Sequence, residues 1–306
     1  MNRELGHEKI LLAMTLAIAS TMGMAVNDAH AQSFSSSQMQ QTKVRDLSFK
    51  SIMRALYAGK MLGNAHIADD ELSQFPNVAL DETSEIGESV VALMHPVIEY
   101  ENQDGQKRYL VAIEKPSFDE DGNLVACHVC DAPVDLYIFK ESSVGGYELV
   151  SRTPAEYDGI GGSWGRSNFN SEDIAGTIQP LGKSLMGSLM NLGYCSTEVC
   201  ESVWLALHLL ESDYIGAYYV GDGGTDTSSI YGEDSPLAYS YESTPSVVNN
   251  GVAYYPIRLH FVGDMPIDES GEQINYVDFS QELLFNQSPK NTNNHEKILP
   301  YSPRSE

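Results

Sequence analysis

The apolar positions between residues 49 and 61 follow the period of an α-helix. Asp46 or Ser48 precedes them as an N-cap, and Gly63 follows as a stop signal. We therefore predict one amphipathic helix ahead of residue 64. The positions that recur every three or four residues are Phe49, Ile52, Met53, Leu56 and Met61.

From about residue 90 the apolar positions alternate with polar ones, which is the period of a β-strand. Asp104 and Gly105, between the first two segments, are typical hairpin residues. Because short strands separated by tight turns pair with their neighbours, this region is predicted to be an antiparallel meander. The expected strands are residues 97–101, 107–114, 124–129, 134–140 and 147–152.

The second half of the chain continues the strand pattern after a stretch interrupted by glycines. Residues 183–190 are interpreted as a short helix and residues 221–229 as a loop, whereas 276–285 is ambiguous. Residues 203–211 are almost all apolar, which favours a central strand. The predicted fold is mainly β, of the α+β class: an antiparallel, meander or sandwich-like sheet with the N-terminal amphipathic helix and short helices. Other expected strands are residues 214–221, 238–243 and 253–263.

The ends of the chain differ from this pattern. Arg3 and Lys9 precede an uncharged apolar run over residues 10–26, and Ala29 and Ala31 give the small-residue spacing of a signal-peptidase site. We predict a signal peptide at residues 1–31 and a periplasmic or secreted protein. The alternative is an uncleaved membrane anchor, which the shortness of the apolar run disfavours.

Between and beyond these segments, composition predicts the remaining organisation. Residues 32–45 are rich in serine and glutamine and are expected to be a flexible leader. Residues 46–285 are expected to form a single β-rich domain. The polar tail, residues 286–306, is expected to be disordered.

The chain is acidic, with a formal net charge of −25. Such a charge disfavours nucleic acid and anionic lipid as partners and favours cationic ones. The simpler interpretation is that the charge only keeps the protein in solution. No segment after the first apolar run approaches the length of a membrane-spanning helix, so no membrane span is expected in the mature chain.

Four cysteines form two close pairs, Cys127 with Cys130 and Cys195 with Cys200. Haem attachment needs a histidine directly after the second cysteine, and here Asp131 stands there. A thioredoxin-like centre needs a helix after the motif, whereas a strand pattern follows. A four-cysteine zinc site remains an alternative. For an exported protein, disulfides are favoured, more so within each close pair than between pairs.

The segment "CHVCDAPVDLYIFK", followed by "YELVSR" and "GIGGSWG", carries a resemblance. It resembles a group of exported proteobacterial proteins of unknown function with a C-H-x-C motif, a strand and a Gly/Trp turn. The resemblance covers about residues 97–165 and extends weakly to "YYPIRLHF". It implies export and a β-rich fold, and it implies no catalytic activity.

The stretch "GGSWG" matches the Gly-x-Ser-x-Gly spacing of a nucleophile elbow centred on Ser163. That elbow needs a strand before the serine and a helix after it, but Asp158 and Gly159 precede it and a polar segment follows. We therefore interpret it as a glycine turn that presents Trp164. Trp164 and His128 are the candidate ligand contacts. A serine hydrolase acting through Ser163 stays an alternative, and no catalytic residue is assigned.

Two acidic loops raise calcium binding as a further alternative. Asp119, Asp121 and Asn123 match the opening of an EF-hand loop, but Leu124 stands at the sixth position, where that loop needs glycine. The second loop is residues 221–226. We predict an exported acidic protein with disulfides, acting as a non-enzymatic binding or envelope-accessory protein toward an unknown protein or small ligand. No cofactor and no metal ligand is assigned, and a zinc- or calcium-binding protein is the alternative.

Overall fold

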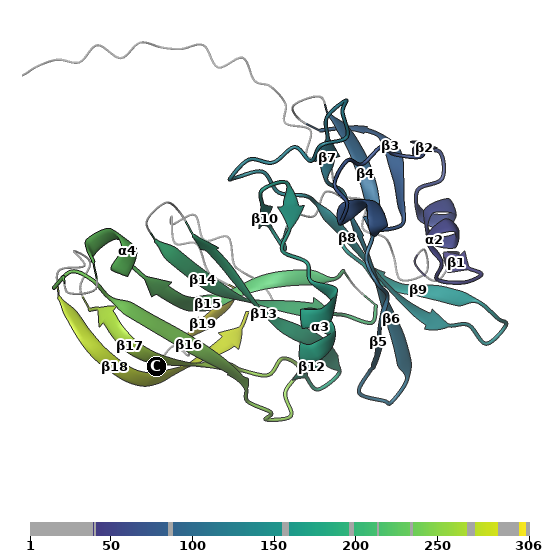
Figure 1. Cartoon of the computed structure of the whole chain (residues 1–306). Helices are drawn as coiled ribbons and strands as arrows, with labels where there is room; N and C mark the ends of the chain where they lie inside the picture. Colours follow the sequence, from purple (N-terminus) through teal and green to yellow (C-terminus); the bar gives the residue numbers. More distant parts are fainter. Residues whose placement is uncertain are drawn as a thin grey trace, which may run out of the picture. The chain divides into compact units, whose positions relative to one another are not determined.

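A computed structural model gives the fold of the chain (Figure 1). It describes residues 39, 41–84, 88–154, 159–195, 199–212, 214–232, 235–267, 273–286 and 300–303. The signal peptide expected at residues 1–31, most of the expected leader and most of the expected tail lie outside these residues. The described residues form two antiparallel sheets, one two-stranded hairpin and short helices, so the prediction of a mainly β fold is confirmed.

The first sheet has the order β1-β9-β8-β6-β4-β3-β2, with β5 pairing with β6 and β7 with β4. The strand expected at residues 107–114 is present with those bounds, and Gly105 in the preceding turn has a φ of 71°. Its strands are β1 (Lys43–Val44), β2 (Met61–Gly63), β3 (Asn77–Thr83), β4 (Ser89–Met94), β5 (Ile98–Glu101), β6 (Lys107–Glu114), β7 (Ser117–Phe118), β8 (Val134–Glu141) and β9 (Tyr147–Arg152).

The second sheet is a meander in which each strand pairs with the next one along the chain. The strand expected around residues 203–211 is central in it, as predicted. The ambiguous segment at 276–285 belongs to a long strand. The strands are β12 (Gln179–Gly182), β13 (Leu185–Cys195), β14 (Cys200–Leu209), β15 (Gly216–Asp226), β16 (Ser240–Val247), β17 (Ile257–Pro266), β18 (Ile274–Phe285) and β19 (Tyr301–Pro303).

Short helices accompany the sheets. Helix α2 (Phe49–Leu56) begins after Ser48, whose hydroxyl accepts a hydrogen bond from Ser51 N–H. It is shorter than predicted, because the chain turns after Tyr57 and Met61 enters β2. Among the described residues no helix is long and apolar enough to cross a membrane. The others are the 3₁₀ helix η1 (Leu72–Gln74), α3 (Ser171–Thr177) and α4 (Ser228–Tyr231).

Several segment predictions are wrong. Residues 183–190 belong mostly to β13, because Leu189 and Met190 point to opposite faces with the two-residue period of a strand. Residues 221–226 continue β15 and are not a loop. Residues 124–129 form no strand, because a disulfide closes a turn there.

The expected leader and tail contain ordered parts as well. Val44 is buried in β1, inside the segment predicted to be flexible. Tyr301 is buried in β19, which pairs with β18, inside the segment predicted to be disordered. In both cases an apolar side chain completes a core formed by residues far away in sequence.

The buried apolar side chains of the described residues form four cores, the smallest of which contains Leu72, Val91, Leu93 and Phe118. On β6, Tyr109, Val111 and Ile113 face Ile52 and Met53 of α2, forming the core under that helix. The opposite faces of β6 and β8 share a core with Leu205, Leu207 and Leu209 of β14, which we call the inter-sheet core.

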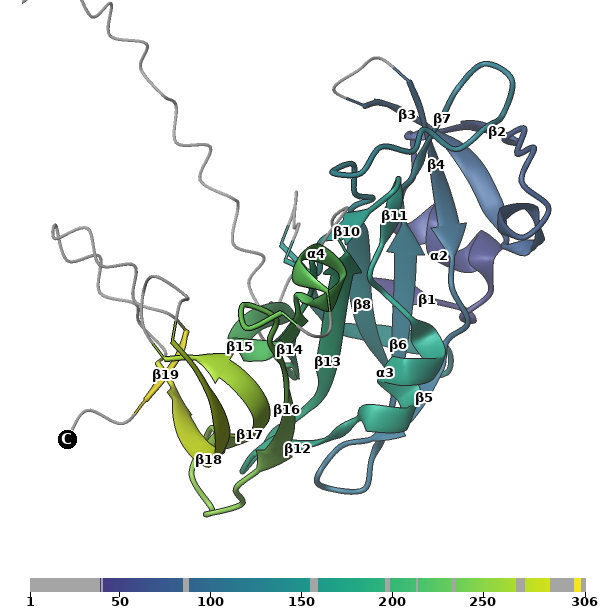
Figure 2. The same ribbon diagram turned by 60° about the vertical axis from the view of Figure 1, so that its left-hand side comes forward.

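The remaining face of the second sheet encloses an inner core of its own. Ala206 of β14 points into it, together with side chains of β17, β18 and β19. Because β19 also contacts β15, the sheet curls around this core. Figure 2 shows α3 beside β13 and α2 beside β1.

Candidate ligand-binding site

Residues 162–167 form a tight hairpin of β10 (Gly162–Ser163) and β11 (Arg166–Ser167). Ser163 pairs with Arg166, so Trp164 and Gly165 are the two turn residues. Their φ angles are 55° and 78°, and positive φ at both positions defines a type I′ turn. For tryptophan this conformation costs about 1–2 kcal/mol. Trp164 is the one non-glycine residue with positive φ in the part of the chain that the structure describes.

The loop between Cys127 and Cys130 holds this turn. A disulfide joins the two cysteines, and their carbonyl oxygens accept hydrogen bonds from Trp164 N–H and Gly165 N–H, each at 2.9 Å. The His128 ring meets the indole edge-on, with the ring centroids 5.4 Å apart. The structure thus brings the two sequence candidates for ligand contact together. The indole residue remains 57% exposed.

Glu114, at the end of β6, anchors the hairpin from the opposite side. This carboxylate is fully buried and accepts a hydrogen bond from Ser167 N–H at 2.8 Å. Arg166 donates to its two oxygens from Nε and Nη2, both at 3.0 Å. His95 Nε2 lies 2.9 Å from the same carboxylate. The hairpin that carries Trp164 is therefore fixed to the first sheet by a buried ionic cluster.

The electrostatics of this cluster favour an ionised carboxylate. Burial by itself raises the pKa of Glu114, but the hydrogen bonds from His95, Arg166 and Ser167 N–H outweigh it and lower the pKa to about 2. The His95 ring is packed against Phe75 and Phe169, with 5.1 Å between the centroids in each pair. Both oxygens of the Glu114 carboxylate already accept hydrogen bonds from within the chain, so the cluster serves to hold the turn in position.

A cavity of about 700 Å³ opens beside the exposed indole, and we call it the Trp164 groove. Its lining includes Leu192 of β13 and Leu205 of β14, which belong to the inter-sheet core, and the neighbouring Val203 of β14. Histidine is the one ionisable side chain among its lining residues, so the groove suits a neutral or apolar group. The other lining residues are His128, Val129, Ile160, Gly161, Gly162, Ser163, Trp164, Asn168, Gly193 and Cys195.

The second disulfide stands at the other side of the groove. It joins Cys195 at the end of β13 to Cys200 at the start of β14, and these two residues face each other in the strand register. Both bridges are the local pairs that the sequence favoured. Each closes a short loop beside the groove and therefore restrains its walls more than the fold as a whole.

Comparisons with models of protein families, with curated proteins and with solved structures found no match. The function of the chain is therefore inferred from the geometry and chemistry of its own residues.

Ser163 does not lie in the setting of a nucleophile elbow. It ends a two-residue strand of an antiparallel hairpin, and β11 follows it where the elbow needs a helix. Within the described residues no hydrogen bond joins its hydroxyl to a histidine. His208, a downstream histidine, is buried in the second sheet against Tyr301.

The metal alternatives receive no geometric support. All four cysteines are in disulfides, so no thiolate is left for zinc. Asp119 accepts hydrogen bonds from Asp121 N–H and Asn123 N–H, which is the local bonding of an Asx turn. No group of three or more His, Cys, Asp or Glu side chains placed to hold a metal ion occurs in the described part of the chain.

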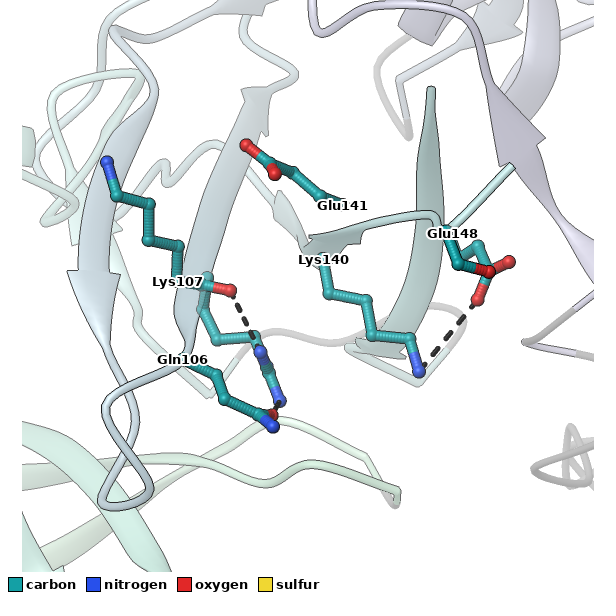
Figure 3. A pocket seen from close by; sticks show the side chains of 7 residues that line it. Gln106, Lys107, Lys140, Glu141 and Glu148 are labelled. Carbon is teal, nitrogen blue, oxygen red and sulfur yellow. Dashed lines mark hydrogen bonds and ion pairs between the residues drawn. The ribbon is translucent and has the colours of Figure 1, made fainter. Parts of the chain in front are cut away.

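A charged cavity of about 430 Å³ lies over β6, β8 and β9 (Figure 3). Figure 3 shows Lys140 extending toward Glu148, and their charged atoms are 3.8 Å apart. Arg108 donates to Gln106 and also forms an ion pair with Glu211. Because these charges are already paired within the chain, this cavity is a weaker candidate than the Trp164 groove.

Sequence reasoning missed the residues that support the groove. Glu114 ends a predicted strand and lies 52 positions before Arg166, so no local pattern joins them. Leu192, Val203 and Leu205 are indistinguishable from ordinary core residues in the sequence. The available signal was the tryptophan itself, at a turn position where asparagine or glycine fits better.

Proposed function

We propose that the protein is exported and acts as a binding protein, with the Trp164 groove as its ligand site. The observation that carries this proposal is an exposed tryptophan held at a positive φ. An unfavourable backbone conformation persists when its surroundings over-determine it, and such positions cluster at ligand sites.

Three sets of contacts hold the indole in place. The carbonyls of Cys127 and Cys130 bind its turn, the Glu114 cluster binds β11, and His128 contacts the ring. A rigid aromatic side chain loses little conformational entropy when a ligand packs on it. The neutral lining of the groove favours an apolar or aromatic group lying flat against the indole.

Export is supported by the signal-peptide pattern and by the two disulfides, which are typical of oxidising compartments. Expression with the native N-terminus tests this part. The mature chain recovered outside the cytoplasm should begin at Gln32, and a chain beginning at Met1 would contradict export.

Ligand binding is tested by saturation-transfer NMR with a fragment library of aromatic and aliphatic compounds. Fragments should bind the wild-type protein and lose about fivefold or more in affinity with Trp164→Ala, because stacking on one aromatic ring contributes on the order of 1 kcal/mol or more. Tyr276→Ala is the matched control, since Tyr276 is also an exposed aromatic residue, on β18.

The two outcomes are distinct. Binding that Trp164→Ala weakens and Tyr276→Ala leaves unchanged supports the proposal. A library without binders, or binders that both variants retain equally, contradicts it.

A further inference from the structure

In the described part of the chain, the outer edge of β13 has no strand partner beyond its first three residues. β12 pairs with residues 185–187 of β13, and no described strand pairs with residues 189–195 on that side. The hydroxyl oxygens of Thr177 on α3 and Ser188 are 2.6 Å apart, and Ile174 of the same helix shares the inter-sheet core with Met190. Leu189 and Met190 are buried, so this edge is covered up to about residue 190. The open segment is residues 191–195, in which Asn191, Gly193 and Cys195 are exposed, and it is about 17 Å long at 3.3 Å per residue.

The open edge lacks the usual protection against strand pairing. Proteins place lysine, proline, inward-pointing charges or bulges on exposed edges. The residues from Asn191 to Cys195 read "NLGYC" and contain neither a charge nor a proline. Their register with β14 is regular from one end to the other.

Two cavities lie along this edge and adjoin each other. Leu189, Met190 and Asn191 line one of about 410 Å³, and the next residues of β13 line the Trp164 groove. Leu189 and Met190 belong to opposite faces of the strand, which places the first cavity at the edge itself. Asn168 lines both cavities.

The charged side chains that line these two cavities are carboxylates. Glu172 and Asp173 of α3 line the first cavity and are exposed, and neither cavity has a lysine or arginine in its lining. The whole chain carries a formal net charge of −25. A basic side chain in the first cavity and an apolar one in the groove therefore match the surface.

We propose that an extended, basic peptide segment of another protein adds to β13 as a further strand. Its backbone bonds the open edge, a lysine or arginine side chain lies near Glu172 and Asp173, and an apolar side chain enters the Trp164 groove. This proposal rests on the proposed function, because it names the ligand class of the same groove.

Isothermal titration with four capped seven-residue peptides tests strand addition. The first peptide alternates lysine with valine and phenylalanine, and the second has glutamate in place of lysine. The other two peptides have the sequence of the first with every second backbone amide N-methylated, on the odd-numbered residues in one and on the even-numbered residues in the other. The first peptide should bind. The glutamate peptide and one of the two methylated peptides should bind at least about tenfold more weakly, because alternate N–H groups of a strand face the same edge.

A pair of protein variants tests the charge. Glu172→Gln combined with Asp173→Asn should weaken the lysine peptide about fivefold, as expected for two exposed charge contacts. Glu242→Gln combined with Asp278→Asn removes two exposed carboxylates from β16 and β18 and should leave affinity unchanged.

Three results would overturn the proposal. They are absence of lysine-peptide binding while fragments still bind at Trp164, equal binding by both methylated peptides and the parent peptide, and a dimer of this chain that the peptide does not dissociate. The first result leaves the proposed function standing. If neither the fragments nor the peptides bind, the proposed function is contradicted as well.

Discussion

Replacing Glu114 with glutamine removes the charge of the buried cluster at nearly constant volume. The wild-type carboxylate receives hydrogen bonds from His95, Arg166 and Ser167 N–H. In Glu114→Gln an amide group faces some of these donors, and the Arg166 guanidinium loses its counterion. Breaking a buried ion pair costs about 3–5 kcal/mol. Arg166 is 31% exposed in its side chain, so water offsets part of this loss and the lower end applies.

The pKa of Glu114 gives a second estimate. It falls from 4.5 to about 2 on folding, and at 1.36 kcal/mol per unit this corresponds to about 3 kcal/mol. Because the folded-state pKa is lowered, this stability is fully present above pH 4.5 and is lost as the pH falls through about 2. At pH 3 about half of it should remain.

Urea unfolding of wild type and Glu114→Gln at pH 7 and pH 3 is the assay. The difference in unfolding free energy should be about 3 kcal/mol at pH 7 and about half that at pH 3. Glu99→Gln is the control, because Glu99 forms an exposed ion pair with Lys107 and its removal should cost less than about 1 kcal/mol.

A local readout separates this cluster from a general loss of stability. The Ser167 amide proton should exchange faster in Glu114→Gln than in wild type, since its acceptor is the carboxylate. A variant within about 1 kcal/mol of wild type at pH 7, or a loss that does not depend on pH, would refute the reasoning.

Two further predictions concern backbone and burial. Gly165→Ala should destabilise the protein by at least about 1 kcal/mol more than Gly59→Ala in urea unfolding. Both glycines have a similar positive φ, 78° at Gly165 and 80° at Gly59, but only at Gly165 does the added carbon meet a neighbouring atom, the Val125 carbonyl oxygen at 2.5 Å. Equal costs for the two variants would exclude this clash. Burial lowers the pKa of His208 from 6.5 to about 3, so between these pH values the unfolded chain binds a proton that the folded chain does not. Between pH 7 and pH 5 the unfolding free energy of wild type should therefore fall by about 2 kcal/mol more than that of His208→Phe. A parallel pH dependence of the two proteins would contradict this.

The parts of the fold that local patterns specify could be predicted. β6 was expected with its observed bounds, because its apolar run follows the Asp104 and Gly105 turn. The central position of β14 followed from its apolar character on both faces. The local pairing of the cysteines followed from their spacing.

Segments that depend on distant partners could not be predicted. Gly187 interrupts the apolar pattern of β13, yet glycine is needed there because an added carbon would meet the Leu207 carbonyl oxygen at 2.2 Å. Tyr301 lies in a polar tail, and only the inner core and His208 explain its burial. The link between Glu114 and Arg166 has no sequence signal at all, so the support of the candidate site became visible only in the fold.

The most direct test of the central claim uses the two indole N–H signals in a ¹H–¹⁵N spectrum, since the chain has two tryptophans. Trp204 Nε1 donates to Ser243, whereas Trp164 is exposed in the groove. On addition of the fragment library in cocktails, the Trp164 signal should shift in a saturable way while the Trp204 signal stays in place. A Trp164 signal that no cocktail moves, or that moves only together with the Trp204 signal, would contradict the assignment of this groove as the ligand site.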